Sequence, residues 1–141
     1  AGNDQMIEAL NLIQDHLFVG IFPALQEAGI AALLDPKSEE AVAQLNATYD
    51  SRRDAFVQAA AKIGWKAFPS KGSFYAWMPV PEGYTSESFA DLLLEKAHVA
   101  VAPGKGFGPA GDAYVRIGLL VEPERLVEAV DSIANLQLFN N

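Results

Sequence analysis

Arg116 is the residue whose type and position in the sequence most favour a functional role, the binding of an acidic ligand. It lies between Val115 and Ile117 in a segment whose pattern predicts a strand over residues 114–120. Alternation along such a strand places Tyr114 and Arg116 on the same face. A guanidinium offers a rigid fork of donors that matches a carboxylate, and it keeps its charge near neutral pH. Arg116 could therefore bind an acidic ligand, or it could be an arginine on a solvated strand face.

The glycine-rich segment 103–108 has the look of a phosphate-binding loop, but its spacing does not fit one. A Walker A loop needs a glycine where this sequence has Val99, and the dinucleotide fingerprint needs one where it has Pro109. The segment is more typical of a turn that requires unusual backbone angles.

Lysine and histidine chemistry is weakly supported. Lys71 could form a Schiff base if it were desolvated, but its polar surroundings are those of a surface lysine. His16 and His98 lie far apart, and neither has a second ligand at metal-binding spacing. We expect no catalytic residue and no metal site in this chain.

The amino-acid composition indicates which classes of partner and which kinds of site to expect. With 18 acidic and 10 basic side chains the formal net charge is −8, and such a surface repels polyphosphate, so we expect no nucleic-acid partner. The chain contains 0 cysteines, which excludes disulfides and thiolate metal sites and fits a reducing compartment. Half of its 141 residues are hydrophobic, as in a globular domain.

The N-terminal third is predicted to be helical. Asn3 or Asp4 can cap a first helix. The apolar positions that follow at helical spacing, which we expect to be buried, are Met6, Leu10, Ile13 and Leu17. The apolar run 17–34 is interrupted by glycine and proline and has no basic flank, so we read it as a second helix opened by Pro23 and not as a membrane span. The rest of the chain or a partner must cover this run. Since the chain starts without Met or a signal-type segment, we expect a fragment or a processed product.

A long helix is predicted over residues 36–63. Asp35 can cap its start and Gly64 is a natural residue for its end. At about 1.5 Å per residue the helix would be about 40 Å long, which is typical of a helix that joins two structural units. A two-helix hairpin that breaks near residues 47–48 is the alternative.

The remaining residues predict an α+β fold. We expect strands over 65–68, 72–78, 99–102 and 114–120, a loop over 103–111, and helices that begin at Thr85 or Ser86 and at Pro123. In this order the helices pack on one face of a small, mostly antiparallel sheet.

Four segments together resemble one family. Residues 49–54 (YDSRRD), 71–77 (KGSFYAW), 103–108 (PGKGFG) and 114–117 (YVRI) are similar, in order and spacing, to segments in the C-terminal part of class I/II aminotransferases. These are pyridoxal-phosphate-dependent enzymes of fold type I, and the resemblance covers practically the whole chain.

The resemblance implies roles for four residues. Arg116 would hold the α-carboxylate of the amino-acid or 2-oxo-acid substrate, and Gly72, Phe107 and Gly108 would line the substrate side of the cleft. The family's cofactor lysine and its Gly-x-Arg-x-Gly segment have no counterpart here. No catalytic or cofactor-binding residue is therefore carried over, and we do not expect pyridoxal 5′-phosphate to bind this chain alone.

The resemblance also implies an organisation. Residues 1–34 would be a helical remnant of the large, cofactor-binding domain, and residues 35–141 the small C-terminal domain. The full-length enzyme would be a cytoplasmic homodimer, without a membrane or nucleic-acid partner, that transfers an amino group from an amino acid to a 2-oxo acid. The fragment alone would be inactive.

Two other functions stay open from the residues. A family member could perform another reaction with the same cofactor, as a C–S lyase or as the effector domain of a fused regulator. A free-standing α+β module could instead bind a small acid through Arg116 without catalysis.

Overall fold

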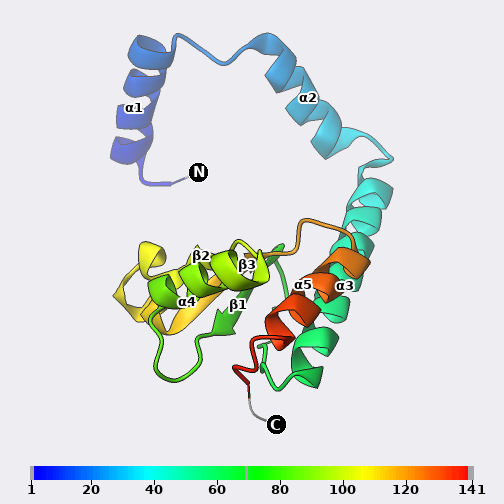
Figure 1. The fold of residues 1–141 in the computed structure, drawn as a ribbon. Helices are drawn as coiled ribbons and strands as arrows, with labels where there is room; N and C mark the ends of the chain where they lie inside the picture. Colours follow the sequence, from blue (N-terminus) through cyan, green and yellow to red (C-terminus); the bar gives the residue numbers. More distant parts are fainter. Residues whose placement is uncertain (1, 69, 140–141) are drawn as a thin grey trace. The chain divides into compact units, whose positions relative to one another are not determined.

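The computed structural model describes residues 2–68 and 70–139 and divides into two compact units, residues 1–43 and 44–141. The first unit contains helix α1 (Asp4–Ile13), a π-helical turn η1 (Gln14–Phe18), helix α2 (Pro23–Leu34) and the start of α3 (Figure 1). Asn3 caps α1, because its side-chain oxygen accepts from the backbone N–H groups of Gln5 and Met6 at 3.1 and 3.3 Å. Pro23 opens α2 as predicted.

The apolar side chains of the first unit are not buried, contrary to our expectation for α1. Its predicted stripe is exposed to 67% at Met6, 58% at Leu10, 44% at Ile13 and 73% at Leu17. The helical spacing is correct, but neither α1 nor α2 contains a buried residue. Within this unit the two helices therefore supply no cover for their own apolar faces.

Helix α3 (Ser38–Lys62) is continuous, so the long helix is confirmed and the predicted alternative of a break near residues 47–48 is wrong. It begins two residues later than predicted, because the Asp35 carboxylate accepts from the Lys37 N–H in a turn that precedes the helix. It ends at Lys62, one residue earlier than predicted, and Gly64, whose φ is 81°, follows that end as expected. The N–H groups of Gly64 and Trp65 donate to the carbonyls of Ala61 and Ala60, the pattern of a Schellman cap.

The second unit is built on a 3-stranded antiparallel sheet in the order β1-β3-β2. Its strands are β1 (Tyr75–Pro79), β2 (Ala102–Pro103) and β3 (Tyr114–Gly118). Helix α4 (Ser86–Leu92) continues into a π-helical turn η2 (Leu93–Ala97), and α5 (Pro123–Ala134) closes the unit. The fold is the predicted α+β class.

One face of this sheet forms the core with the helices. Ala76, Met78, Val115 and Ile117 are buried, while the residues between them on β1 and β3 face the other side. The buried cluster is completed from α3, α4 and α5 by residues that include Phe56, Phe89 and Val130. Trp65 stands at its centre, and its Nε1 donates to the Pro79 carbonyl at 2.8 Å. On the opposite face Tyr75, Trp77 and Arg116 remain partly or fully exposed.

Five predicted segments need correction. The strands predicted over 72–78 and 114–120 form over Tyr75–Pro79 and Tyr114–Gly118. Residues 65–68 form no strand, because the backbone of Trp65 is used to cap α3. The strand predicted over 99–102 shortens to Ala102–Pro103, since the Val99 N–H instead donates to the Leu93 carbonyl. The predicted loop contains two 3-10 turns, η3 (Gly104–Phe107) and η4 (Pro109–Ala113).

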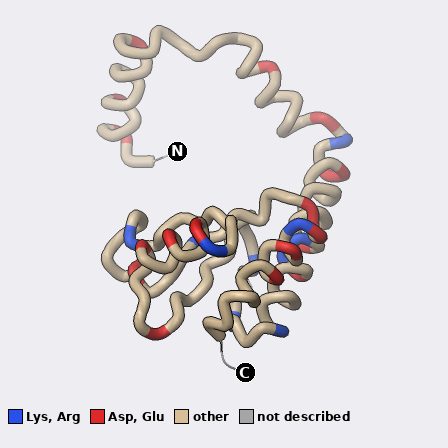
Figure 2. Tube along the Cα trace, in the orientation of Figure 1, with Lys and Arg blue, Asp and Glu red and all other residues tan. Residues whose placement is uncertain are grey.

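Two features concern the helices as a group. Among the described residues, no helix is both long and apolar enough to cross a bilayer. Acidic positions occur on every one of the five α-helices, with few basic positions among them, as Figure 2 shows.

Candidate functional site

Arg116 lies on the open face of the sheet, as the alternation predicted. Its neighbours Val115 and Ile117 are buried on the core side, while Arg116 is half-buried on the other. The cross-strand partner of Arg116 is Trp77 on β1 and, on the other side, Ala102 on β2. The central strand of the sheet therefore holds the guanidinium between two neighbouring strands.

Aromatic rings cover the guanidinium. Its central carbon lies 4.0 Å from the ring centre of Tyr75 and 4.0 Å from that of Phe107. Such cation–π contacts stabilise the charge and orient the planar group, and they leave its donor-bearing edge as the part that can bind a ligand. Arg116 is therefore not the free arginine of a solvated strand face.

No acidic side chain neutralises Arg116 within the described parts of the chain. The ion pairs there belong to other cations, namely Arg52, Arg53, Lys105 and Arg125. A fixed, half-buried cation without a carboxylate partner suits an anionic ligand. A ligand carboxylate could accept two parallel hydrogen bonds from this fork.

Phe107 reaches Arg116 from the end of η3. Its ring is 51% exposed and packs edge-on against Trp77, with ring centres 5.6 Å apart. The next residue, Gly108, has a φ of 126°, which only glycine adopts without strain. Of the predicted site residues, Phe107 thus contacts Arg116, and Gly108 follows it in the same turn.

Gly72 lies in a different setting. It lines a cavity of about 410 Å³ with residues of α3 and of the segment before β1, among them Tyr49, Arg53 and Lys71. Gly72 precedes Tyr75 by three positions, so the chain connects this cavity to the ring that covers Arg116. The structure shows no direct contact of Gly72 with the guanidinium.

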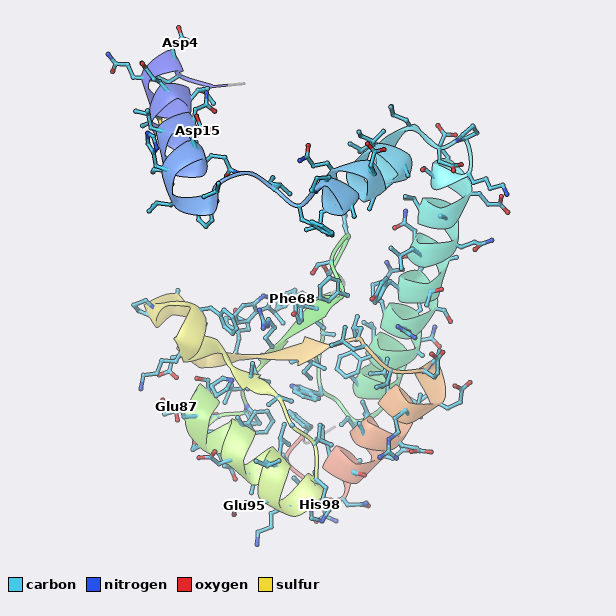
Figure 3. The ribbon with its side chains drawn as sticks, turned by 90° about the horizontal axis from the view of Figure 1, so that it is seen from above. Asp4, Asp15, Phe68, Glu87, Glu95 and His98 are labelled. Atoms are coloured by element: carbon cyan, nitrogen blue, oxygen red, sulfur yellow. The ribbon has the colours of Figure 1, made fainter. Side chains whose placement is uncertain are left out.

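The charges next to the 104–113 turns are paired. Lys105 Nζ lies 2.7 Å from a carboxylate oxygen of Glu87, which raises the pKa of Lys105. Hydrogen bonds from Ser86 lower the pKa of Asp112. Glu87 lies at the start of α4, and His98 follows the end of η2 (Figure 3). Because Lys105 pairs with Glu87 and Asp112 accepts from Ser86, the 104–113 turns contact the beginning of α4.

Lys71 and Lys105 are two described lysines to compare with the requirements of a pyridoxal-phosphate site. Such a site needs a lysine amine beside donors for the phosphate. Lys105 is paired with Glu87, and Lys71 lines a cavity shared with Asp50 and Arg53, two residues already paired with each other. No group of three or more potential metal ligands occurs in the part of the chain that the structure describes.

Sequence reasoning missed the covering role of Tyr75 and the support from Trp77. The signal for both was present, because alternation over 72–78 places them on one strand face. That this face meets the face of Arg116 depends on the pairing of β1 with β3, which local pattern does not define.

Comparisons with known proteins agree with this architecture. Residues 1–133 match the model of the family described as aminotransferase class I and II. The chain is 57% identical over 138 residues to the L-glutamine–4-(methylsulfanyl)-2-oxobutanoate aminotransferase of Bacillus subtilis, covering 98% of this chain and 34% of that protein. It is 44% identical over 132 residues to an LL-diaminopimelate aminotransferase of Moorella thermoacetica, covering 94% and 33%.

Solved structures give the same result. The substrate-bound BacF structure from Bacillus subtilis superposes with a TM-score of 0.90 at 42% identity, covering 99% of this chain and 35% of that one. An aromatic aminotransferase from Pyrococcus horikoshii superposes with a TM-score of 0.90 at 33% identity, covering 96% and 37%. The chain thus spans about a third of the length of these relatives. It belongs to the class I and II aminotransferase family.

Proposed function

We propose that this chain is the carboxylate-binding part of an aminotransferase that transfers an amino group from an amino acid to a 2-oxo acid. The observation that carries the proposal is the Arg116 guanidinium, which has rings of Tyr75 and Phe107 over it and no acidic partner among the described residues. Both substrates of such a reaction carry a carboxylate next to the reacting carbon, so one fixed cation can orient both.

Arg116 holds that carboxylate in this proposal through two parallel N–H···O bonds. Phe107 and Gly108 line the site beside it, and their support is the contact of the Phe107 ring with the guanidinium. Gly72 contributes a lining position without a side chain, at the edge of the cavity next to α3. A fixed orientation of the carboxylate presents the α-carbon in one geometry, which lowers the entropic part of the barrier.

Pyridoxal 5′-phosphate and the lysine that binds it belong, in this proposal, to residues outside this chain. The support is that the chain spans about a third of the length of its relatives and that its sequence has no counterpart of the family's Gly-x-Arg-x-Gly segment. We assign residues 1–34 to the large, cofactor-binding domain and residues 35–141 to the small domain.

A homodimer in the cytoplasm is the proposed setting. The exposed apolar side chains of α1 and α2 support association with further protein surface. The content of 0 cysteines supports a reducing compartment. The proposed ligands are the amino acid and the 2-oxo acid, with neither a membrane nor nucleic acid as partner.

The test is the substitution Arg116→Ala in the full-length enzyme. Hydrogen bonds to a charged group contribute about 1.5–3 kcal/mol each, so loss of two should lower kcat/KM by about 100-fold or more. Arg125→Ala is the matched control, because Arg125 is exposed and pairs with Glu128 on the same helix. Steady-state kinetics with an amino acid and a 2-oxo acid measures both variants.

The same assay separates the other functions. Amino-group transfer to an added 2-oxo acid supports the proposal, whereas release of a thiol and a 2-oxo acid identifies a C–S lyase. Ligand binding without turnover in the full-length protein identifies a regulator or a non-catalytic acid-binding module. An Arg116→Ala variant with the kcat/KM of the wild type removes Arg116 from the proposed role.

A further inference from the structure

Ser86 joins three parts of the second unit that are distant in sequence. It is the one polar residue of the described chain that is fully buried, with 0% exposure. Its hydroxyl donates to Asp112 Oδ1 at 2.7 Å and accepts from the Lys105 N–H at 3.3 Å. The first residue of α4 is thereby bonded to both 3-10 turns, η3 and η4.

Asp112 uses one oxygen for two bonds to the same residue. Its Oδ1 accepts from the backbone N–H of Ser86 at 3.2 Å as well as from the hydroxyl. An N–H in the first turn of a helix has no acceptor within that helix, so Asp112 satisfies a donor that would otherwise be left unpaired. The interaction is local to α4 and η4, and neither side chain reaches the guanidinium of Arg116.

The two turns also cross each other closely. A Cβ at Gly104 would collide with the Gly111 carbonyl oxygen and would lie 2.8 Å from the Trp77 ring. A Cβ at Gly111 would collide in turn with the Gly104 carbonyl oxygen. The segment from Gly104 to Gly111 is therefore a closed loop, and Phe107 stands within it.

Few contacts hold the Phe107 side chain in place. Its ring is 51% exposed and is absent from the buried cluster, so core packing does not determine its position. Apart from the edge contact with Trp77, its place over Arg116 depends on the anchoring of the loop that carries it.

We propose that Ser86 and Asp112 are positioning residues, which anchor the loop 104–113 and so keep the Phe107 ring over the guanidinium of Arg116. Loss of the anchor lets the ring leave, water then reaches one face of the guanidinium, and the fork loses its fixed orientation. The consequence for binding rests on the function proposed above, whereas the anchoring of the loop does not.

The first experiment measures the anchor without activity. Hydrogen–deuterium exchange of the full-length enzyme compares the wild type with Asp112→Ala and Asp112→Asn. Asparagine retains an Oδ1 that can accept both Ser86 bonds, so only the alanine variant should accelerate exchange in peptides from residues 104–113. Peptides from α5 serve as the internal reference and should exchange at the wild-type rate. Unchanged exchange over 104–113 in Asp112→Ala overturns the anchor.

The second experiment tests whether the anchor acts through Phe107. Displacements of about 1 Å can cost up to about 100-fold in rate, so we expect Asp112→Ala to raise KM for the amino acid by about 10-fold with a smaller change in kcat. In a Phe107→Ala background the same substitution should add no further change in KM. Asp112→Asn should restore KM to near the wild-type value, and Glu128→Ala, which removes an exposed ion pair with Arg125 on α5, should leave it unchanged.

The two experiments separate the possible failures. A full effect of Asp112→Ala on KM in the Phe107→Ala background overturns the proposal that the anchor acts through Phe107. Accelerated exchange over 104–113 with an unchanged KM supports the anchor and overturns its proposed effect on the guanidinium. The Arg116→Ala kinetics test the role of Arg116 as the carboxylate site independently.

Discussion

At the residue scale, the surroundings of Arg116 matter as much as its charge. The central carbon of the guanidinium lies 4.0 Å from the ring centres of both Tyr75 and Phe107, and in the proposed site the edge of the group binds the carboxylate. A lysine at this position would keep the charge but lose both the fork and the stacking. The strand pattern predicted the face on which Arg116 lies. It did not predict the rings beside Arg116, because Tyr75 and Phe107 lie 41 and 9 residues before it in the sequence.

Removal of the Tyr75 ring should weaken binding of the carboxylate. A cation–π contact contributes about 0.5–2 kcal/mol, so Tyr75→Leu should raise KM for the amino acid by about 2- to 30-fold. Tyr75→Phe is the matched control, because it keeps the ring and removes only the hydroxyl, and its KM should stay close to that of the wild type. Steady-state kinetics of the full-length enzyme measures both, and equal KM values for the leucine and phenylalanine variants would contradict the role of the ring.

Asp112 should make the free energy of unfolding depend on pH in the acidic range. Hydrogen bonds from Ser86 lower its pKa in the folded protein, whereas the unfolded chain keeps a value of about 4. As the pH falls, the unfolded state therefore takes up the proton first. The stabilisation by the charged carboxylate is fully present above about pH 4 and is lost as the pH falls through the folded pKa.

Urea unfolding measures this dependence. The midpoint difference between wild type and Asp112→Asn should be largest near pH 6 and should shrink below about pH 4. A difference that is the same at pH 6 and pH 3 would show that the charge of Asp112 does not contribute. Sequence alone offered no sign of this carboxylate, since its partner Ser86 lies 26 residues away and belongs to another element.

At the scale of elements, the end of a helix or strand could be predicted where the residues that determine it are neighbours in the sequence. The ends of α3 carried such signals, and the Gly64 cap was confirmed because a Schellman pattern needs only its own few residues. The strand expected at 65–68 was wrong for the same reason, since Trp65 both completes that cap and fills the core. A short apolar run does not reveal where its backbone hydrogen bonds go.

The glycines of the loop 104–113 have different functions. We expected unusual backbone angles there, and only Gly108 among them has a left-handed φ. Gly104 and Gly111 are required for another reason, because two backbone segments approach where a Cβ would stand. Sequence cannot distinguish these causes, since the approach exists only once the loop has folded.

The substitution Gly104→Ala should therefore be costly. The new Cβ would meet carbonyl oxygens of Gly111 and Tyr114, which are backbone atoms and cannot rotate away. Overpacking of this kind costs about 1–3 kcal/mol or more in free energy of unfolding. Gly106→Ala is the matched control, because nothing lies within 4 Å of its Cβ, and it should change stability by less than about 1 kcal/mol. Urea unfolding measures both, and an equal cost would contradict the crossing of the turns.

At the scale of the whole molecule, the two units differ in whether their large apolar side chains are buried. The second unit has its own core, built from α3, α4, α5 and one face of the sheet. In the first unit large apolar side chains remain exposed, including Val19 at 84%, Leu33 at 82% and Leu34 at 76%. The composition of the run 17–34 indicates that it needs cover, but it does not indicate which surface provides that cover.

We expect this difference to govern the solution behaviour of the 141-residue chain. Exposed apolar surface of this extent favours association, so the chain should sediment as concentration-dependent oligomers. A shorter chain of residues 44–141 keeps the core and removes the first unit, so it should sediment as a monomer and unfold cooperatively. Analytical ultracentrifugation over a range of concentrations compares the two. If the 141-residue chain remains monomeric while residues 44–141 associate, the apolar faces of α1 and α2 are not the cause, and the support they lend to a subunit interface is lost.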